Sequence, residues 1–241
     1  MKYFFSILLL FSLVGLCQAQ QGQNKVEADT VEREKMQLAY LPSALRIGPA
    51  VNTLIQTAID DQGTYYGLQA DLAMGRFMLG FDYGHAELSR QSETGVPASE
   101  AYQYTSNGDY YKIGVDVNLL RDKKADTYDA RGDIIYFGLK YAFSIIDDEV
   151  SFSTSENFWE TSAINQRNEN LMVSWVEMNA GVKVAIFKHV FLGYTLRYRF
   201  AQNSAGRSSL VPYRVPGFGS GEDESNFGFD YHIFYQIPFR K

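Results

Sequence analysis

The feature that most constrains the fold of this chain is a repeated alternation of apolar and polar residues. Between Phe77 and Gly84 the odd positions carry Phe, Leu, Phe and Tyr, and the even positions carry Met, Gly, Asp and Gly. Every odd position from Phe227 to Phe239 is likewise aromatic or aliphatic. A period of two residues is typical of a β-strand whose two faces meet different surroundings. The pattern therefore predicts an all-β protein.

The same alternation recurs in eight segments, an even number that suits antiparallel strands connected in chain order. The eight predicted strands are Ser43 to Ile59, Thr64 to Met74, Arg76 to Leu88, Tyr102 to Leu120, Asp133 to Ile146, Glu169 to Ile186, Val190 to Gln202 and Asn226 to Arg240.

Alternation alone does not say which face is covered. A soluble sandwich buries its apolar face, whereas a membrane barrel turns that face to lipid and hides the polar one. Three features favour the membrane. The polar face is rich in Gly, which a water-facing sheet avoids. The strands have the length of tilted membrane-crossing strands, and the alternation reaches Phe239 near the end of the chain. We therefore predict an eight-stranded antiparallel up-and-down transmembrane β-barrel with a polar, side-chain-filled interior.

The N-terminal residues predict export. Met1 to Ala19 combines Lys2, an apolar stretch and small residues before a cleavage point, which is typical of a secretory signal peptide. Lipid attachment at Cys17 is the alternative, but Leu16 occupies the position where that processing requires a small residue. We expect residues 1–19 to be removed, 20–42 to form a polar periplasmic extension, and 43–241 to form the barrel.

Composition excludes several classes of function. The formal net charge of -6 argues against a nucleic-acid partner, which would require a basic face. The single cysteine, Cys17, lies in the predicted signal, so the mature chain has no thiol for catalysis, thiolate metal binding or disulfides.

Connection lengths predict an orientation, because outer-membrane barrels have short periplasmic turns and long outer loops. The connections at Gly75 and Lys188 are short, and those at Ser89 to Ala101, Asp147 to Asn168 and Asn203 to Ser225 are long. This places both termini in the periplasm. Two connections fit less well: Asp60 to Gly63 is a short outer loop, and Arg121 to Gly132 is a long, charged inner turn.

The predicted interior carries charges of both signs. An eight-stranded barrel is just wide enough for side chains to fill, and a buried ion without a partner is costly, so these charges are expected to pair. The alternative is a wet path for protons or ions. The candidate network consists of Arg46, Asp71, Arg76, Asp82, Lys112, Asp116, Lys140, Glu177, Lys183, Arg197, Arg199 and Asp230.

Hydrolytic chemistry would require a nucleophile, a His base and an orienting carboxylate. His232 is the one His predicted inside the barrel, and Asp230 shares its face. No Gly-x-Ser-x-Gly motif accompanies the pair, so a structural His is the favoured interpretation. The acidic run Gly217 to Glu224 has no regular ligand spacing and is expected to be a solvated, flexible loop. We predict no metal and no cofactor.

Four short motifs carry a resemblance to known proteins: Val211 to Gly219 (VPYRVPGFG), Asn226 to Gly228 (NFG), Phe234 to Phe239 (FYQIPF) and Trp175 to Glu177 (WVE). With these, the chain from Leu41 onward resembles small eight-stranded outer-membrane barrels, and among them an uncharacterised family from Bacteroidota. The resemblance implies an outer-membrane location and no established activity.

The predicted function is that of a non-enzymatic accessory or interaction protein, in contact with outer-membrane lipids and with a possible partner protein of the envelope. A lipid-modifying enzyme centred on His232 is the alternative, and a narrow channel comes third.

Overall fold

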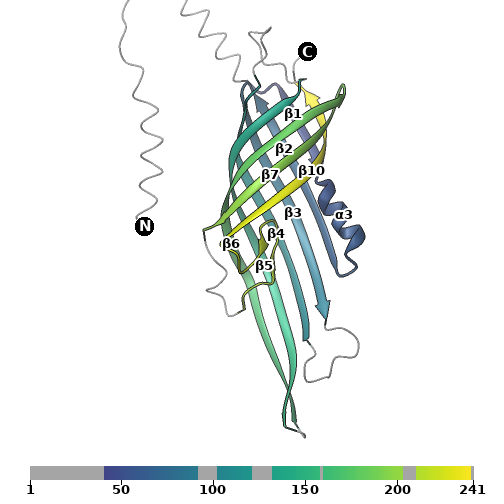
Figure 1. Ribbon diagram of the computed structural model, residues 1–241, viewed down its shortest axis with the longest axis vertical. Coiled ribbons are helices and arrows are strands. Elements are labelled where there is room, and N and C mark those ends of the chain that lie inside the picture. The colour runs from purple at the N-terminus through teal and green to yellow at the C-terminus, as the bar shows by residue number, and fades with distance from the viewer. Residues whose placement is uncertain (1–40, 92–101, 121–131, 158–159, 203–209, 240–241) are drawn as a thin grey trace, which may run out of the picture. The chain divides into compact units, whose positions relative to one another are not determined.

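The computed structural model of the chain describes residues 41–91, 102–120, 132–157, 160–202 and 210–239 (Figure 1). The predicted signal peptide and nearly all of the polar extension lie outside the described residues. No helix in the described part is long and apolar enough to cross a membrane. The long strands are β1 (Ala44–Pro49), β2 (Gly63–Met74), β3 (Phe77–Gln91), β4 (Tyr102–Asn118), β5 (Ile134–Asn157), β6 (Glu160–Phe187), β7 (Val190–Ala201) and β10 (Ser225–Pro238).

These eight strands form a closed antiparallel barrel in the order β1-β10-β7-β6-β5-β4-β3-β2. Each long strand pairs with its neighbour in the chain, and β1 pairs with β10 to close the ring, with Ala44 opposite Pro238. The predicted up-and-down barrel is therefore confirmed. Two short strands, β8 (Arg214–Val215) and β9 (Gly219–Ser220), form a separate hairpin between β7 and β10.

The two faces of the barrel have opposite chemistry. Leu79, Val115 and Leu139 point outward and are exposed, whereas Lys112 and Glu177 point inward and are buried. A soluble protein would bury the apolar residues and expose the charged ones. The apolar exterior of this barrel therefore suits an apolar solvent such as lipid. An aromatic row crosses the outside on neighbouring strands. Its ring centroids are 6.3 Å apart for Tyr66 and Tyr83, and 5.3 Å for Tyr83 and Tyr111. Such a row is typical of the girdle at a membrane interface.

The ends of the barrel differ, and we name them by their connections. At the turn end, tight turns at Gly75–Arg76 and Lys188–His189 connect β2 to β3 and β6 to β7. Gly75 has a φ of 59°, a conformation that a residue without a Cβ adopts at little cost. At the hairpin end lie the β5–β6 connection and the β8–β9 hairpin, as Figure 1 shows.

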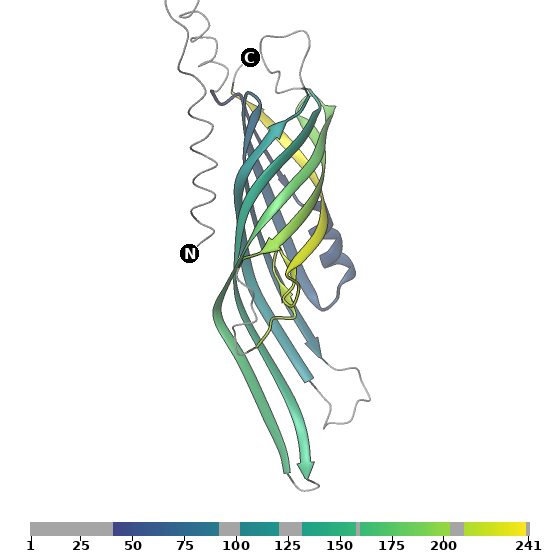
Figure 2. The ribbon, with the colours of Figure 1, turned by 60° about the vertical axis from the view of Figure 1, so that its left-hand side comes forward.

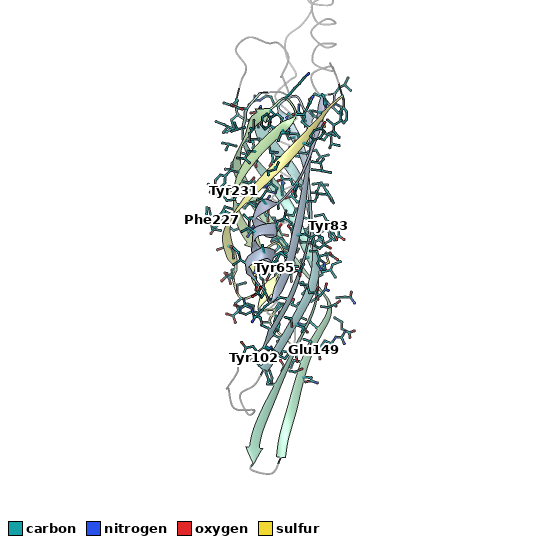
Figure 3. All side chains as sticks on the ribbon, turned by 90° about the vertical axis from the view of Figure 1, so that its right-hand side faces the viewer. Tyr65, Tyr83, Tyr102, Glu149, Phe227 and Tyr231 are labelled. Carbon is teal, nitrogen blue, oxygen red and sulfur yellow. The ribbon has the colours of Figure 1, made fainter. Side chains whose placement is uncertain are left out.

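The first predicted strand, Ser43 to Ile59, is wrong in its second half. β1 ends at Pro49, and Val51–Ile59 forms the helix α3. The helix contacts β2 and β10. Figure 3 shows it in the wall of the barrel, beside the strand that carries Phe227 and Tyr231. In the hairpin-end half, α3 thus occupies the place of the missing strand between β2 and β10.

Like the strands, α3 is polar toward the barrel and apolar outward. Leu54, Ile55 and Ile59 are exposed on one face, and Asn52 and Gln56 lie on the other. The Thr57 hydroxyl accepts a hydrogen bond from the backbone N–H of Tyr65 and lies 2.7 Å from its carbonyl oxygen, to which it donates. Thr57 therefore serves an edge of β2 that has no strand neighbour there. A helix is tolerated in the wall because its side chains satisfy that edge.

The predicted loop Asp147 to Asn168 is also wrong, because β5 and β6 continue through most of it as one ladder. Val150 pairs with Gln166, and the pairing extends to Asn157 and Glu160. A register shift occurs between Ile146 and Asp148, where the barrel part of the ladder ends. We call residues 147–170 the arm. Its base still pairs with β4 as far as Phe152, and Figure 2 shows that only its outer part projects beyond the other strands.

The predicted flexible loop Gly217 to Glu224 is a correction too. Its first half includes β9, and Phe218 is buried, as is Val215 just before it. We call residues 210–224 the cap. Gly217 and Gly219 have φ values of 75° and 135°, which L side chains rarely adopt. The glycines that suggested flexibility thus permit a defined turn. Residues 92–101, 121–131 and 203–209 of the other connections lie outside the described part.

The facing of the strands can be tested at neighbouring positions of β4. Val115→Arg should lower the free energy of unfolding by about 2–4 kcal/mol, because it places a charge in lipid about midway between Tyr111 of the aromatic row and the end of β4 at Asn118. Gly114→Val should also destabilise, because its Cβ would lie 2.1 Å from the backbone oxygen of Leu139. Ser89→Arg, an exposed position beyond the aromatic row, is the control. Urea unfolding in detergent or lipid measures all three, and a harmless Val115→Arg would show that the apolar face is not in lipid.

Candidate functional site

The interior near the turn end is organised around one carboxylate. Asp71 of β2 accepts a hydrogen bond from Arg46 of β1 at 2.6 Å and a second from Lys183 of β6. Arg46 also donates from Nε to the Gln236 side chain at 3.0 Å. The Lys183 ammonium lies 4.7 Å from the Phe234 ring centroid. Because these residues come from opposite sides of the barrel, their contacts cross the lumen.

In the middle of the barrel, Arg197 of β7 binds three carboxylates. Its Nη1 lies 2.9 Å from Asp82 and 3.0 Å from Glu177, and its Nε pairs with Asp230. Asp82 also pairs with Lys140 at 2.8 Å. Charged hydrogen bonds are the strong ones, and here they connect β3, β5, β6 and β7, while the ion pair with Asp230 adds β10. The barrel wall is therefore cross-braced through its interior.

Toward the hairpin end the centre is Glu177, which is fully buried. Its Oε1 accepts hydrogen bonds from Lys112 at 2.7 Å, from Trp175 at 2.8 Å and from Arg199 at 3.2 Å. Three cations, with Arg197 through Oε2, thus share this single carboxylate.

The cap closes this end of the lumen. Phe218 lies 5.5 Å from the Trp175 ring and belongs, with Val215, to an apolar cluster inside the mouth of the barrel. Lys112 donates to the Gly217 carbonyl at 3.2 Å, and Arg199 donates to the Phe218 carbonyl at 2.9 Å. The same cations that bind Glu177 therefore also hold the cap.

The structure brings most of the predicted network together, with two exceptions. Arg76 lies in the β2–β3 turn and is exposed, so it is outside the lumen. Asp116 is buried, but neither of its carboxylate oxygens has a hydrogen-bond partner among the described residues. The analysis of charges alone missed the uncharged partners Trp175 and Gln236, although both share the inward parity of their strands.

The enzyme candidates do not form a catalytic arrangement. Asp230 is committed to Arg197 and accepts from Asn52 at 2.8 Å. The His232 ring stacks on Phe234 with 5.3 Å between centroids, and its Nδ1 has no partner in the described part of the chain. His232 therefore lacks the orienting carboxylate of a triad there. His85 is on the exterior, 3.0 Å from Asp109, and His189 lies in the β6–β7 turn.

Metal binding finds no support in the described residues, because no group of three His, Cys, Asp or Glu side chains there is placed to hold an ion. What the interior offers instead is a set of mutually paired charges closed by an apolar cap. Chemically, this arrangement is a plug.

The pairing predicts that two buried carboxylates respond differently to the same change. Asp71→Asn removes the counter-charge of the buried Lys183 and one partner of Arg46, so we expect it to cost about 3–5 kcal/mol of unfolding free energy. Asp116→Asn removes a carboxylate without a described partner, so its effect should stay within about 1 kcal/mol or be stabilising. Unfolding of both variants in the same detergent measures the difference. Equal losses of unfolding free energy would mean that the ion pairs of Asp71 do not stabilise the barrel.

Comparisons with known proteins find similar barrels at low identity. The attachment invasion locus protein Ail of Yersinia pestis is 11% identical, with 81% of this chain and 97% of that chain covered and a TM-score of 0.36. The N-terminal β-barrel domain of Pseudomonas aeruginosa OprF is 11% identical, with 81% of this chain and 98% of that chain covered and a TM-score of 0.33. Neisserial surface protein A is 11% identical, with 82% of this chain and 95% of that chain covered and a TM-score of 0.32. No curated protein matches the sequence. A family model for a domain of unknown function, DUF6048, matches residues 1–241, so the chain belongs to that uncharacterised family, as its motifs implied.

Proposed function

We propose that the protein is an integral outer-membrane barrel that acts without catalysis, as an interaction protein that offers its arm to a partner in the envelope or at the cell surface. The apolar exterior with its aromatic row supports the membrane, and the signal-like N-terminus supports export. Short turns at one end and the arm at the other support a periplasmic turn end and an outward hairpin end.

The arm is the observation that carries the proposal. β7 pairs with β6 only from Trp175 to Phe187, whereas β6 begins at Glu160. Within the described residues, β6 therefore has no strand partner on its β7 side between Glu160 and Arg167. A free edge presents backbone donors and acceptors in a row, which suits the addition of an extended segment from another protein.

The plugged interior favours this role over the two alternatives. A channel requires a continuous wet path, but the side chains of Arg46, Lys183 and Arg197 cross the lumen and the cap closes its mouth. An enzyme requires a reactive group with its activating partners, and Nδ1 of His232 has no hydrogen-bond partner in the described part. What stays accessible is the outer surface of the hairpin end.

Location and closure can be tested together. Mature protein should fractionate with outer membranes and migrate faster unboiled than boiled on a detergent gel, because the closed sheet resists unfolding. In planar bilayers its conductance should stay at background, since paired side chains fill the lumen. Recovery in the soluble fraction would contradict the membrane assignment, and steady ion flow would contradict the plug.

Shortening the arm tests the interaction role. Val150 and Gln166 lie opposite each other, so residues 151–165 can be replaced by Asn-Gly, which favours a tight two-residue hairpin. The shortened barrel should fold and keep its gel shift, but lose the proteins that co-purify with the wild type from mild detergent. Lys188→Ala, in a turn at the other end, is the control and should retain them. Unchanged co-purification by the shortened protein would show that the arm is not the contact surface.

A further inference from the structure

A small cavity lies inside the hairpin end, behind α3 and beneath the cap. Its volume is about 120 Å³, enough for a few water molecules or one small ion. α3 contributes Asn52, Thr53 and Gln56 to its lining, and the cap contributes Arg214 to Gly219. The remaining wall comes from β2, β3, β4, β7 and β10.

The lining has a surplus of positive charge. Lys112, Arg199 and Arg214 line the cavity, and Asp230 is the one carboxylate among its described lining residues. Asp230 is already paired with Arg197 outside the lining. Lys112 and Arg199 compete for a single oxygen of Glu177. Lys112 is buried, and Arg199 and Arg214 are half-buried. Cations held away from bulk water favour a counter-charge beside them, so the cavity is electrostatically suited to an anion.

Arg214 is the cation with the most free binding capacity. Among the described residues it forms no ion pair with a carboxylate. Its guanidinium carbon lies 4.8 Å from the centroid of the Tyr65 ring, and its Nη1 lies 3.4 Å from the Tyr65 hydroxyl. With the Gln56 amide oxygen facing it, the two terminal nitrogens lie 2.7 and 2.9 Å from that oxygen. Neutral partners thus hold the planar group in place at the cavity without neutralising it.

α3 separates this cavity from the lipid. Its inward residues line the cavity, while Leu54, Ile55 and Ile59 are exposed on the outer face. Side chains rather than a β-ladder attach α3 to its neighbours, through Thr57 to β2 and through Asn52 to β10. The wall here is one helix thick, so an anion bound behind it can be free in solution or carried on the headgroup of a lipid.

We propose that this cavity binds a phosphate-class oxyanion, with Arg214 as the principal donor and Lys112 and Arg199 as the further cations. Arg matches the oxygens of phosphate with two parallel hydrogen bonds, and its fixed orientation on Tyr65 prepares it for such a ligand. The proposal concerns the interior behind α3 and does not depend on the arm.

The first experiment adds free phosphate to the whole mature protein in a non-ionic detergent. The unfolding temperature is measured against inorganic phosphate and against chloride at equal ionic strength. The wild type should be stabilised by phosphate alone. Arg214→Gln should weaken the apparent affinity by about tenfold or more, as expected for one lost charged hydrogen bond. Arg167→Gln removes an exposed arginine of the arm and should respond like the wild type.

The second experiment uses lipid. The protein is reconstituted in nanodiscs of phosphatidylcholine with or without phosphatidylglycerol, and bound lipid is counted by native mass spectrometry after release into detergent. Retained phosphatidylglycerol that free phosphate displaces would identify a headgroup as the ligand, whereas stabilisation by phosphate without retained lipid would identify a free anion. Arg214→Gln should weaken either signal to the same extent, by about tenfold or more in apparent affinity. No response in either experiment, or a response that Arg214→Gln leaves unchanged, would overturn the proposal. Arg214 would then serve only to hold α3 against the cap.

Discussion

The whole structure depends on the confinement of polar side chains to a lumen only eight strands wide. Once the apolar face of each strand turns outward, the side chains on the other face are shut off from bulk solvent and contact mainly one another. Charges at those positions must therefore find partners across the barrel, as Asp71 does with Arg46 and Lys183. Gly residues make room for these long side chains. At Gly84, for example, a Cβ would lie 2.3 Å from the Tyr110 ring.

The helix α3 obeys the same confinement with a different backbone. A strand would serve the free edge of β2 with its own N–H and C=O groups, whereas α3 satisfies its backbone internally and leaves that edge open. The Thr57 hydroxyl satisfies part of that edge, because it forms hydrogen bonds with both the backbone N–H and the backbone carbonyl of Tyr65. The exchange loosens the ladder in one sector of the wall but admits polar helix residues to the interior. The cavity behind α3 exists because of that exchange.

Sequence reasoning could predict the strands and the inward charges, because both follow from a period of two residues that the membrane enforces. It failed where another rule took over. Val51 to Ile59 also fits a helical period, with Leu54, Ile55 and Ile59 on one face, but its β-branched residues favour a strand locally. The sequence predicts a loop where the arm lies, because polar residues stand at both odd and even positions there and hide the alternation. Particular pairs such as Arg197 with Asp82 depend on strand stagger, which local patterns do not contain.

The cap connects features that are separate in the sequence. Its Gly217 and Phe218 carbonyls accept hydrogen bonds from Lys112 and Arg199 of the plug, and Arg214 reaches Gln56 of α3. At its start, the Leu210 carbonyl accepts from Asn168 at the base of the arm, at 2.7 Å. A plug made only of paired charges would not need this segment, since the ion pairs already cross the lumen. The conformation of the cap, set by Gly217 and Gly219, therefore fixes the arm, α3 and the charged interior to one another.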